Sequence, residues 1–180
     1  MDNYVISREI SGQSVRTLRE KLKMTQKEFA DLTCSSKRTV ENWESKKEPL
    51  SGPIVTLIEL FMRKPELVNY MRIPPRTTTM RLYYMYNEMV CTVIDVNEIN
   101  RNITIRNYID NPLFRAFGVN TQPDYDDYEE FLKSRCFPES RDKMKIELER
   151  LGIPFYDPIL IIEKTQGRVE GDNFSIKIER

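Results

Sequence analysis

Four polar side chains near residue 40 have the chemistry and the spacing of a nucleic-acid contact. They are Lys37, Arg38, Glu41 and Asn42. Arginine and lysine can bond guanine edges or phosphates, asparagine can pair with adenine, and glutamate can accept from cytosine N4. Residues three and four apart share one side of a helix, so these side chains would face the same way. The competing interpretation is an ordinary solvated helix face, and the surrounding elements must decide between the two.

The segment around them, residues 25–45, is patterned as two short helices joined by a tight turn. Thr25, with Glu28 three residues later, is a capping-box sequence and predicts the start of the first helix. Ser35 or Ser36 can cap the second helix. The apolar positions expected to face inward are Phe29, Ala30, Leu32, Val40 and Trp43. The second helix therefore has an apolar inner side and a polar outer side, which favours the contact interpretation.

Helical patterns also flank this pair. Apolar residues at helical spacing predict one helix at 14–22 and another at 54–62, and a short helix or turn is expected after Pro65. The texture changes after Arg72, because the following residues hold two prolines and no helical period. We therefore expect an all-α domain of about five helices at residues 1–72, followed by a linker at residues 73–80.

The remaining residues, 81–180, predict a second domain that contains a sheet. The strand-like segments are 80–86, 89–96, 102–109 and 174–180. The expected helix starts are at Asp124, near Pro138 and at Asp157, which Pro158 follows. The first three strands predict an antiparallel meander, which the last strand can join. The expected fold class is thus multi-domain, with the all-α domain followed by a small α+β domain that has an antiparallel sheet.

The sequence from Val15 to Met71 resembles the helix-turn-helix of the lambda-repressor-like (Xre) family, in particular the DNA-binding domains of HigA- and MqsA-type antitoxins. The residues that carry the resemblance are Thr25-Gln26, Phe29-Ala30, Arg38-Thr39-Val40, Asn42-Trp43-Glu44 and the later runs "SGP" and "KPE". The resemblance covers well under half of the chain, and it makes no statement about the second domain.

This resemblance implies that the second helix of the pair lies in the major groove of double-stranded DNA, while the first braces against the backbone. The implied DNA contacts are Gln26, Ser36, Lys37, Arg38, Thr39, Glu41 and Asn42. A homodimer on a palindromic operator is implied as well, because one copy reads too few bases for useful specificity. The implied function is an autorepressing, antitoxin-like transcriptional regulator.

The turn between the two helices departs from the family pattern. Where the family has an aliphatic residue, glycine and valine, this chain has Thr33, Cys34 and Ser35. A left-handed backbone is easy for glycine and costly for a residue with a Cβ atom. We therefore expect the chain to differ from the family at this turn.

Two sets of residues in the second domain are candidates for contact with a partner. One is a run of tyrosines on a predicted strand: Tyr83, Tyr84 and Tyr86. They predict either an exposed protein-binding or dimer surface, or half-buried aromatics of the sheet. The other set is Arg135, Arg141 and Arg168. These arginines could form an anion site or pair with nearby acids.

The segment 134–168 contains the elements Ser134-Arg135, Pro138, Arg141, Leu151-Gly152, Tyr156-Asp157-Pro158 and Thr165-Gln166-Gly167-Arg168. On these elements it is similar to a small domain found beside helix-turn-helix segments and kinase-type toxins in gut bacteria. That similarity implies a toxin-binding or other partner-binding role for the second domain. A second hypothesis comes from another class: a phage or mobile-element inhibitor of a host defence enzyme, of the anti-CRISPR type. There the acidic second domain would block the enzyme, and the first domain would regulate its own gene.

Charge and composition argue against catalysis. Residues 1–72 hold 13 basic and 10 acidic residues, whereas residues 73–180 hold 15 and 18, so the two parts differ in sign. The chain has no histidine and no glycine-rich phosphate loop, and we predict no catalytic residues, no metal and no cofactor. Three scattered cysteines, no apolar run near the ~18–20 residues of a membrane span and no leader pattern predict a cytoplasmic protein without a membrane partner.

Overall fold

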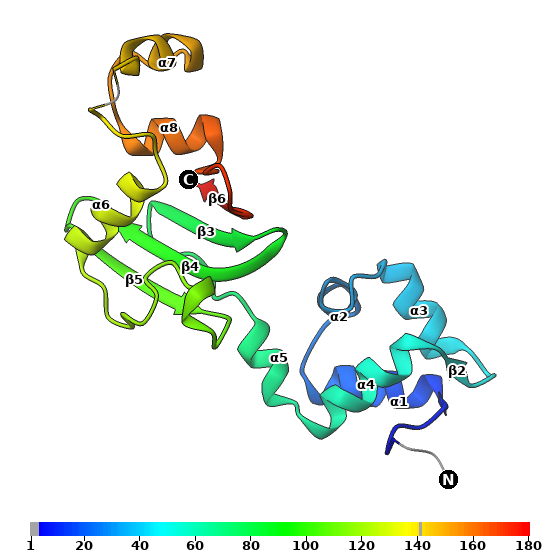
Figure 1. Ribbon diagram of the computed structural model, residues 1–180. Coiled ribbons are helices and arrows are strands. Elements are labelled where there is room, and N and C mark those ends of the chain that lie inside the picture. Colours follow the sequence, from blue (N-terminus) through cyan, green and yellow to red (C-terminus); the bar gives the residue numbers. More distant parts are fainter. Residues whose placement is uncertain (1–3, 141) are drawn as a thin grey trace. The chain divides into compact units, whose positions relative to one another are not determined.

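The computed structural model describes residues 4–140 and 142–180, and the chain divides into two compact units. The first unit is Met1–Arg72 and the second is Ile73–Arg180. Helices make up nearly all of the regular structure in the first unit, and an antiparallel sheet with further helices makes up the second (Figure 1). This is the predicted fold class.

The first unit contains the five expected helices and a short strand pair that the sequence did not predict. The helices are α1 Gly12–Lys21, α2 Gln26–Leu32, α3 Lys37–Ser45, α4 Pro53–Arg63 and α5 Glu66–Met71. The strands β1, Glu9–Ile10, and β2, Leu50–Ser51, pair antiparallel, so that Ile10 lies opposite Leu50. This pairing ties the residues before α1 to the loop after α3.

Local sequence signals explain where these helices begin. Thr25 accepts a hydrogen bond from the Glu28 amide while the Glu28 carboxylate accepts from the Thr25 amide, so the predicted capping box is present. Ser36, rather than Ser35, caps α3 by accepting from the Thr39 amide. The buried core beneath the helices consists of Val15, Leu18, Met24, Phe29, Ala30, Val40, Leu50, Ile58, Phe61 and Val68.

A glycine allows α1 and α3 to approach closely. Gly12, the first residue of α1, is buried against the end of α3. A Cβ atom at this position would collide with the carbonyl oxygen of Trp43 and would lie 3.2 Å from that of Glu44. Since both obstacles are backbone atoms, only glycine fits here without moving one of the helices.

The second unit is built on a four-stranded antiparallel sheet. Its strands are β3 Met80–Tyr86, β4 Met89–Asn97, β5 Asn102–Asn107 and β6 Phe174–Glu179. Their order is β5-β4-β3-β6, so the last strand joins the meander beside β3, as the sequence predicted. The register shifts between Tyr84 and Met85, which marks a bulge in the β3–β4 pair.

Two helices cover one face of this sheet. α6, Tyr125–Ser134, begins at Asp124, and α8, Pro158–Thr165, begins at Asp157, as predicted. The largest buried cluster joins the sheet to these helices; its members are Met80, Leu82, Tyr84, Cys91, Ile94, Val96, Tyr128, Phe131, Leu132, Ile162 and Ile176. A short 3-10 helix, Pro112–Phe114, lies between the sheet and α6 in sequence.

The remaining helix, α7, differs from the prediction at its start. It spans Met144–Leu151 and was expected to begin near Pro138. Among the described residues, no side chain caps its first turn. Met144, Leu148 and Leu151 of this helix pack in a small separate cluster with Ile153 and Ile161. It ends at Gly152, which has the left-handed conformation expected of a helix C-terminus.

The residues between the two units are bonded to the second sheet. The guanidinium of Arg81 donates to the carbonyl oxygen of Pro74 at 2.8 Å and to both oxygens of Asp95. Arg76 donates to the carbonyl oxygen of Glu179 at 2.9 Å, and the Thr78 hydroxyl donates to Asp95. Residues 73–79 have no helix or strand, and β3 begins at residue 80, inside the predicted linker.

In the part of the chain that the structure describes, no helix is both long enough and apolar enough to span a lipid bilayer.

Candidate nucleic-acid interface

In the pair α2–α3, the second helix, α3, packs its apolar inner side against the core of the first unit. Val40 is fully buried, and Trp43 is half-buried against the same core, as the sequence predicted. The turn before α3 contains Cys34 with φ of +50°. Cys34, which stands where the family pattern has glycine, therefore places a residue with a Cβ atom in the left-handed region.

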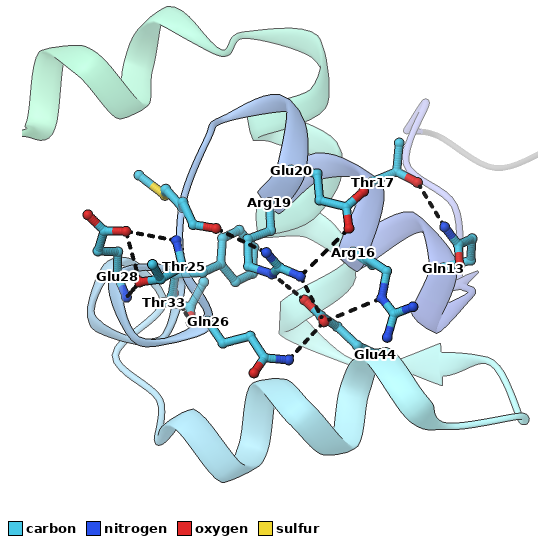
Figure 2. Close-up of polar contacts among 12 residues, drawn as sticks. Gln13, Arg16, Thr17, Arg19, Glu20, Thr25, Gln26, Glu28, Thr33 and Glu44 are labelled. Atoms are coloured by element: carbon cyan, nitrogen blue, oxygen red, sulfur yellow. Dashed lines mark hydrogen bonds and ion pairs between the residues drawn. The ribbon is translucent and has the colours of Figure 1, made fainter.

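A buried carboxylate joins the three helices around this core. Glu44 lies on the inner side of α3, and its side chain is only 1% exposed. Arg19 of α1 donates to its two oxygens at 2.6 and 3.1 Å, and Gln26 of α2 donates at 3.0 Å (Figure 2). Arg16 lies 3.6 Å from the same carboxylate. The orientation of α3 is thus fixed by directional bonds as well as by apolar packing.

Glu44 and Arg19 of this cluster form a charged pair. Burial by itself would raise the pKa of Glu44, but the hydrogen bonds from Arg19 and Gln26 outweigh it, so this pKa lies below its ordinary value. The hydrogen bond to Glu44 likewise raises the pKa of Arg19. Both groups therefore stay charged at neutral pH. Arg19 also donates to the carbonyl oxygen of Met24, which links the cluster to the turn before α2.

The outer side of α3 carries two side chains that have no partner in the part of the chain that the structure describes. Arg38 and Asn42 are exposed and lie one turn apart. Neither side chain makes a hydrogen bond or an ion pair within residues 4–140 and 142–180. A guanidinium and a carboxamide at this spacing can each form two hydrogen bonds to an edge of a base.

Lys37 and Glu41, by contrast, are bonded to each other. The Lys37 ammonium lies 3.2 Å from the Glu41 carboxylate, and both side chains are largely exposed. Surface pairs of this kind contribute only about 0.3–0.5 kcal/mol, so Lys37 can exchange Glu41 for a phosphate at little cost. While the pair persists, Glu41 is a poor acceptor for a base.

The hydroxyls at the start of α3 serve the helix itself. The oxygens of Ser36 and Thr39 lie 2.8 Å apart, and Ser36 also accepts from the Thr39 amide. The amides of Lys37 and Arg38 precede the first intrahelical bonds. These amides can therefore donate to an anion, because the first N–H groups of a helix have no partner within it.

Gln26 is the one predicted contact residue outside α3 and its cap. It is half-buried, and its amide nitrogen is bonded to Glu44. The structure thus brings Gln26 to α3, as a brace between α2 and α3. Its carbonyl oxygen and its second N–H are the groups left for an external contact.

Comparisons with known proteins agree with this geometry. Residues 15–67 match the family model described as helix-turn-helix. These residues form a helix-turn-helix domain. Over 68 residues the chain is also 37% identical to the antitoxin HigA-2 of Vibrio cholerae serotype O1. That alignment covers 38% of this chain and 65% of the antitoxin, so the chain spans less than two thirds of the length of that protein.

Outside the helix-turn-helix domain, the structure buries two of the residues expected to contact a partner. Tyr84 stacks on Phe174 at 4.9 Å in the core of the second unit, and burial raises its pKa to about 12. Arg135 is 8% exposed and donates to Asp172, to Gly167 and to the carbonyl oxygen of Phe174. Neither side chain can contact a partner at the surface, because each is buried within the second unit.

The other candidates of the second unit lie nearer to solvent. Tyr86 is half-buried against Phe114, and the half-buried Tyr83 donates to the Glu179 carboxylate at 2.6 Å. Arg168 is exposed and donates to the side chain of Gln166. Arg141 lies outside the described residues. The three arginines are therefore not shown to form one site.

Sequence reasoning did not find the Glu44 cluster. The signal was present, because Glu44 is four residues after Val40 and so falls on the inward side of α3. An acid on a buried side requires a charged or donating partner. Arg16 and Arg19 have the spacing to supply it from one side of α1, but pairing them with α3 requires the tertiary structure.

Proposed function

We propose that this chain is a sequence-specific DNA-binding transcriptional regulator of the antitoxin type that acts in the cytoplasm. α3 lies in the major groove, and α2 braces it from the backbone side. The observation that carries the proposal is the contrast between the two sides of α3. Glu44 is bonded to Arg19 and Gln26 on the inner side, whereas Arg38 and Asn42 are exposed on the outer side and have no partner among the described residues. That is what a rigidly held base-reading helix requires.

Each predicted contact residue has a role in this proposal. Arg38 reads guanine and Asn42 reads adenine. Lys37 leaves Glu41 to bind a phosphate, and the amides at the start of α3, held in place by the Ser36 and Thr39 cap, bind another. Glu41 accepts from cytosine once Lys37 has moved. Gln26 keeps its bond to Glu44 and adds a phosphate contact with its second N–H.

The same proposal includes a homodimer on a palindromic operator. One recognition helix spans few base pairs, and two-fold dimers of such domains bind half-sites about 34–36 Å apart. Specificity then comes from two copies of Arg38 and two of Asn42. An operator in the DNA upstream of its own gene would make the regulator autorepressing.

The second unit, in this proposal, binds a partner protein or holds the dimer together. Similarity to the antitoxin HigA-2 over the first unit supports a toxin as the partner. The net acidic charge of residues 73–180 supports a basic partner. Co-purification of the tagged full-length chain with the product of the neighbouring gene tests this part. A dimer that retains no neighbouring product would favour dimerisation as the role of the second unit.

The DNA-binding proposal is tested by gel-shift titration of the full-length chain on the DNA upstream of its own gene. Arg38→Ala is expected to weaken binding by about 1–3 kcal/mol, because a bidentate contact to a base is lost. Lys37→Ala is expected to weaken binding to all sequences and to reduce the salt dependence by about one phosphate.

Arg150→Ala is the matched control for charge. Arg150 is an exposed arginine of the second unit, and its partner is Glu147. Removal of its charge should leave operator binding within error of the wild type. The proposal fails if Arg38→Ala and Arg150→Ala bind the operator equally well, or if the wild type does not prefer the operator to unrelated DNA of the same length.

A further inference from the structure

The last strand of the sheet, β6, has one side that pairs with no strand of the described chain. The sheet order is β5-β4-β3-β6, so β6 forms an edge and has β3 on its other side (Figure 1). A hollow of about 600 Å³ lies along this edge, between Ile162 and Glu163 of α8 and Met85 of β3. An edge strand offers backbone N–H and C=O groups that can pair with a further strand. The edge of β6 is therefore a place where another strand can join the sheet.

The bonds that β6 already makes show which of its residues face outward. In an antiparallel pair, alternate residues direct their backbone groups toward the neighbouring strand or away from it. The Ile176 amide donates to the carbonyl oxygen of Gln166, at the end of α8, at 2.7 Å, so Ile176 faces away from β3. Ile178 is two residues later and faces the same way. Its N–H and C=O have no hydrogen-bond partner within residues 4–140 and 142–180.

The first part of this edge is already occupied. The backbone of Phe174 is bonded to the side chains of Asp172 and Arg135. The Ile176 amide is bonded to the end of α8. Within the described part of β6, Ile178 is therefore the outward-facing residue that can exchange both of its backbone bonds with another strand. A full backbone pair at this edge must be centred on it.

The charged side chains on either side of Ile178 lie on the open face of the sheet. The Ile178 side chain packs against the core under the helices, so Lys177 and Glu179 alternate onto the opposite face, where both are exposed. Lys177 makes no ion pair with any residue that the structure describes. Glu179 accepts from the Tyr83 hydroxyl at 2.6 Å and lies 3.7 Å from Arg76. A carboxylate has room for a further donor, so each side chain can take a partner of opposite charge.

A second copy of β6 matches these charges in one antiparallel register. When Ile178 lies opposite Ile178 of the second copy, each of the two amides donates to the carbonyl oxygen of the other. Lys177 of each copy then lies directly opposite Glu179 of the other. These two opposed pairs flank the bonded pair, in positions where side chains on neighbouring strands come closest.

The neighbouring registers do not fit. If Lys177 faced Lys177, two ammonium groups would be opposed, and the backbone bonds would need the Ile176 amide, which is already held. If Ile176 faced Ile176, the same amide would be missing. A lysine on an edge strand ordinarily discourages pairing. Here the acid two residues later makes the edge complementary to itself in a single register.

We propose that β6 pairs antiparallel with β6 of a second copy of this chain, about a two-fold axis at Ile178, so that the two sheets join edge to edge. The same residues contribute from both copies, as a closed dimer requires. The half-buried Ile178 side chains meet on the helix-covered face, and the Lys177–Glu179 pairs form on the open face. The role of this dimer rests on the proposed function, which needs two recognition helices, but the pairing itself requires no DNA.

Sedimentation equilibrium of the full-length chain without DNA, over a series of concentrations, measures this dimer. The pairing is short, so the wild type is expected to show a reversible equilibrium between monomer and dimer. Lys177→Glu opposes two carboxylates at both ends of the bonded pair, and Glu179→Lys opposes two ammonium groups there. Each substitution should raise the Kd of the dimer about tenfold or more, because two attractive contacts become repulsive.

A mixture of the two variants tests the register directly. When one Lys177→Glu chain pairs with one Glu179→Lys chain, opposite charges face each other at both ends again. The mixture should therefore dimerise about as tightly as the wild type, although neither variant does so alone. A misfolded variant could not gain this affinity. The matched controls are Lys145→Glu and Glu149→Lys, which reverse the same charges at exposed positions of α7 outside the hollow and should dimerise as the wild type does.

Amide hydrogen exchange, followed by NMR, identifies the strand that forms the contact. The Ile178 amide is bonded only in the dimer, so its exchange should slow as the concentration of the wild type rises. The same slowing is expected in the mixture of variants, and none in either variant alone. The Ile176 amide is bonded to Gln166 within one chain and is the internal reference, with protection that does not depend on concentration.

Four results would overturn the proposal. One is a wild type that stays monomeric, and another is a dimer that neither charge reversal weakens, which would place the interface elsewhere on the chain. The third is a loss of the dimer in both variants without recovery in the mixture. The fourth is a monomer that loses a complex with the product of the neighbouring gene on Lys177→Glu, which would assign the edge to a strand of a partner protein.

Gel-shift titration of the same samples separates this interface from the proposed function. Preference for the operator without a β6 dimer would keep the DNA-binding proposal and reject the interface. A β6 dimer without preference for the operator would do the reverse. If both hold, the mixture of variants should recover the operator affinity that each variant loses alone.

Discussion

Arg38 and Glu44 show two opposite uses of charge on the same helix. Arg38 is exposed and has no partner among the described residues, so its guanidinium can take up the geometry that a ligand requires. Glu44 is buried with bonds from Arg19 and Gln26, so its side chain has one geometry. Because Glu44 fixes the orientation of α3, the Arg38 side chain starts from a defined position. A side chain that contacts a ligand is positioned only as precisely as the helix that carries it.

The support has a pH-dependent contribution that can be measured. Glu44→Gln is expected to lower the free energy of unfolding at neutral pH by about 3 kcal/mol, because the half-buried Arg19 loses its bidentate counter-ion and keeps only the more distant, exposed Glu20. The pKa of Glu44 is depressed in the folded state from its ordinary value of 4.5. Its contribution is therefore fully present above that value and is lost as the pH falls through the folded-state pKa.

Urea denaturation of both proteins from neutral to acidic pH checks this expectation. The difference between wild type and Glu44→Gln should be largest near neutrality and should shrink on acidification. Glu48→Gln is the control, because Glu48 is an exposed acid close in sequence. A constant difference at all pH values would show that Glu44 acts through packing and not through its charge.

At the scale of elements, local sequence signals predicted most of what forms. Thr25, Asp124 and Asp157 cap helices because a short polar side chain meets the free amides that follow it. What the sequence did not predict depends on contacts between distant residues. The β1–β2 pair needs Ile10 opposite Leu50, and the Glu44 cluster needs α1 beside α3. The start of α7 depends on what the helix packs against.

The candidate site divides in the same way. The exposed residues of α3 could be predicted because a helical period places them on one side. The sequence could not predict which of these side chains lack a partner. Each polar side chain has several possible partners, and only the structure shows that Lys37 pairs with Glu41 and that Gln26 bonds to Glu44. Burial of Tyr84 and Arg135 likewise follows from α6 and the final strand, which are far from the tyrosines in sequence.

The turn between α2 and α3 makes a prediction of its own. Cys34 has φ of +50°, where a Cβ atom costs about 1–2 kcal/mol and glycine costs little. Glycine also adds freedom to the unfolded chain, so Cys34→Gly is expected to raise the free energy of unfolding by a net of about 0.5–1 kcal/mol. Chemical denaturation of the two proteins measures the difference.

The neighbouring position provides the control. Thr33 has φ of −96°, and its hydroxyl donates to the carbonyl oxygen of Phe29. Thr33→Gly should therefore lower stability, because it relieves no strain and removes a hydrogen bond. If both glycine substitutions destabilised the chain, the left-handed turn would not be under strain.

At the scale of the whole chain, two units have separate buried cores. The first centres on residues of α1 to α4, and the second on the sheet with α6 and α8. The residues between them belong structurally to the second unit, since Pro74, Arg76 and Thr78 are all bonded to side chains or backbone of the sheet. The connecting segment is thus part of the fold that follows it.

This attachment predicts how fragments of the second unit behave. A fragment of residues 73–180 is expected to be more stable than one of residues 80–180 by about 3 kcal/mol. The shorter fragment lacks the bonds from Arg81 to Pro74, from Arg76 to Glu179 and from Thr78 to Asp95, and each contributes about 1 kcal/mol. Both fragments keep Met80, which is buried. Equal midpoints in urea would show that residues 73–79 are a passive linker.

The strained turn also gives the chain a natural attachment point for a probe. Of its three cysteines, Cys34 is exposed, Cys91 is buried and Cys136 is half-buried, with burial raising the pKa of the Cys136 thiol to about 12. A thiol-reactive dye should therefore modify Cys34 first. That position lies two residues before the cap of α3. Without any added cysteine, the dye-labelled chain can thus report by fluorescence when a ligand binds at the outer side of this helix.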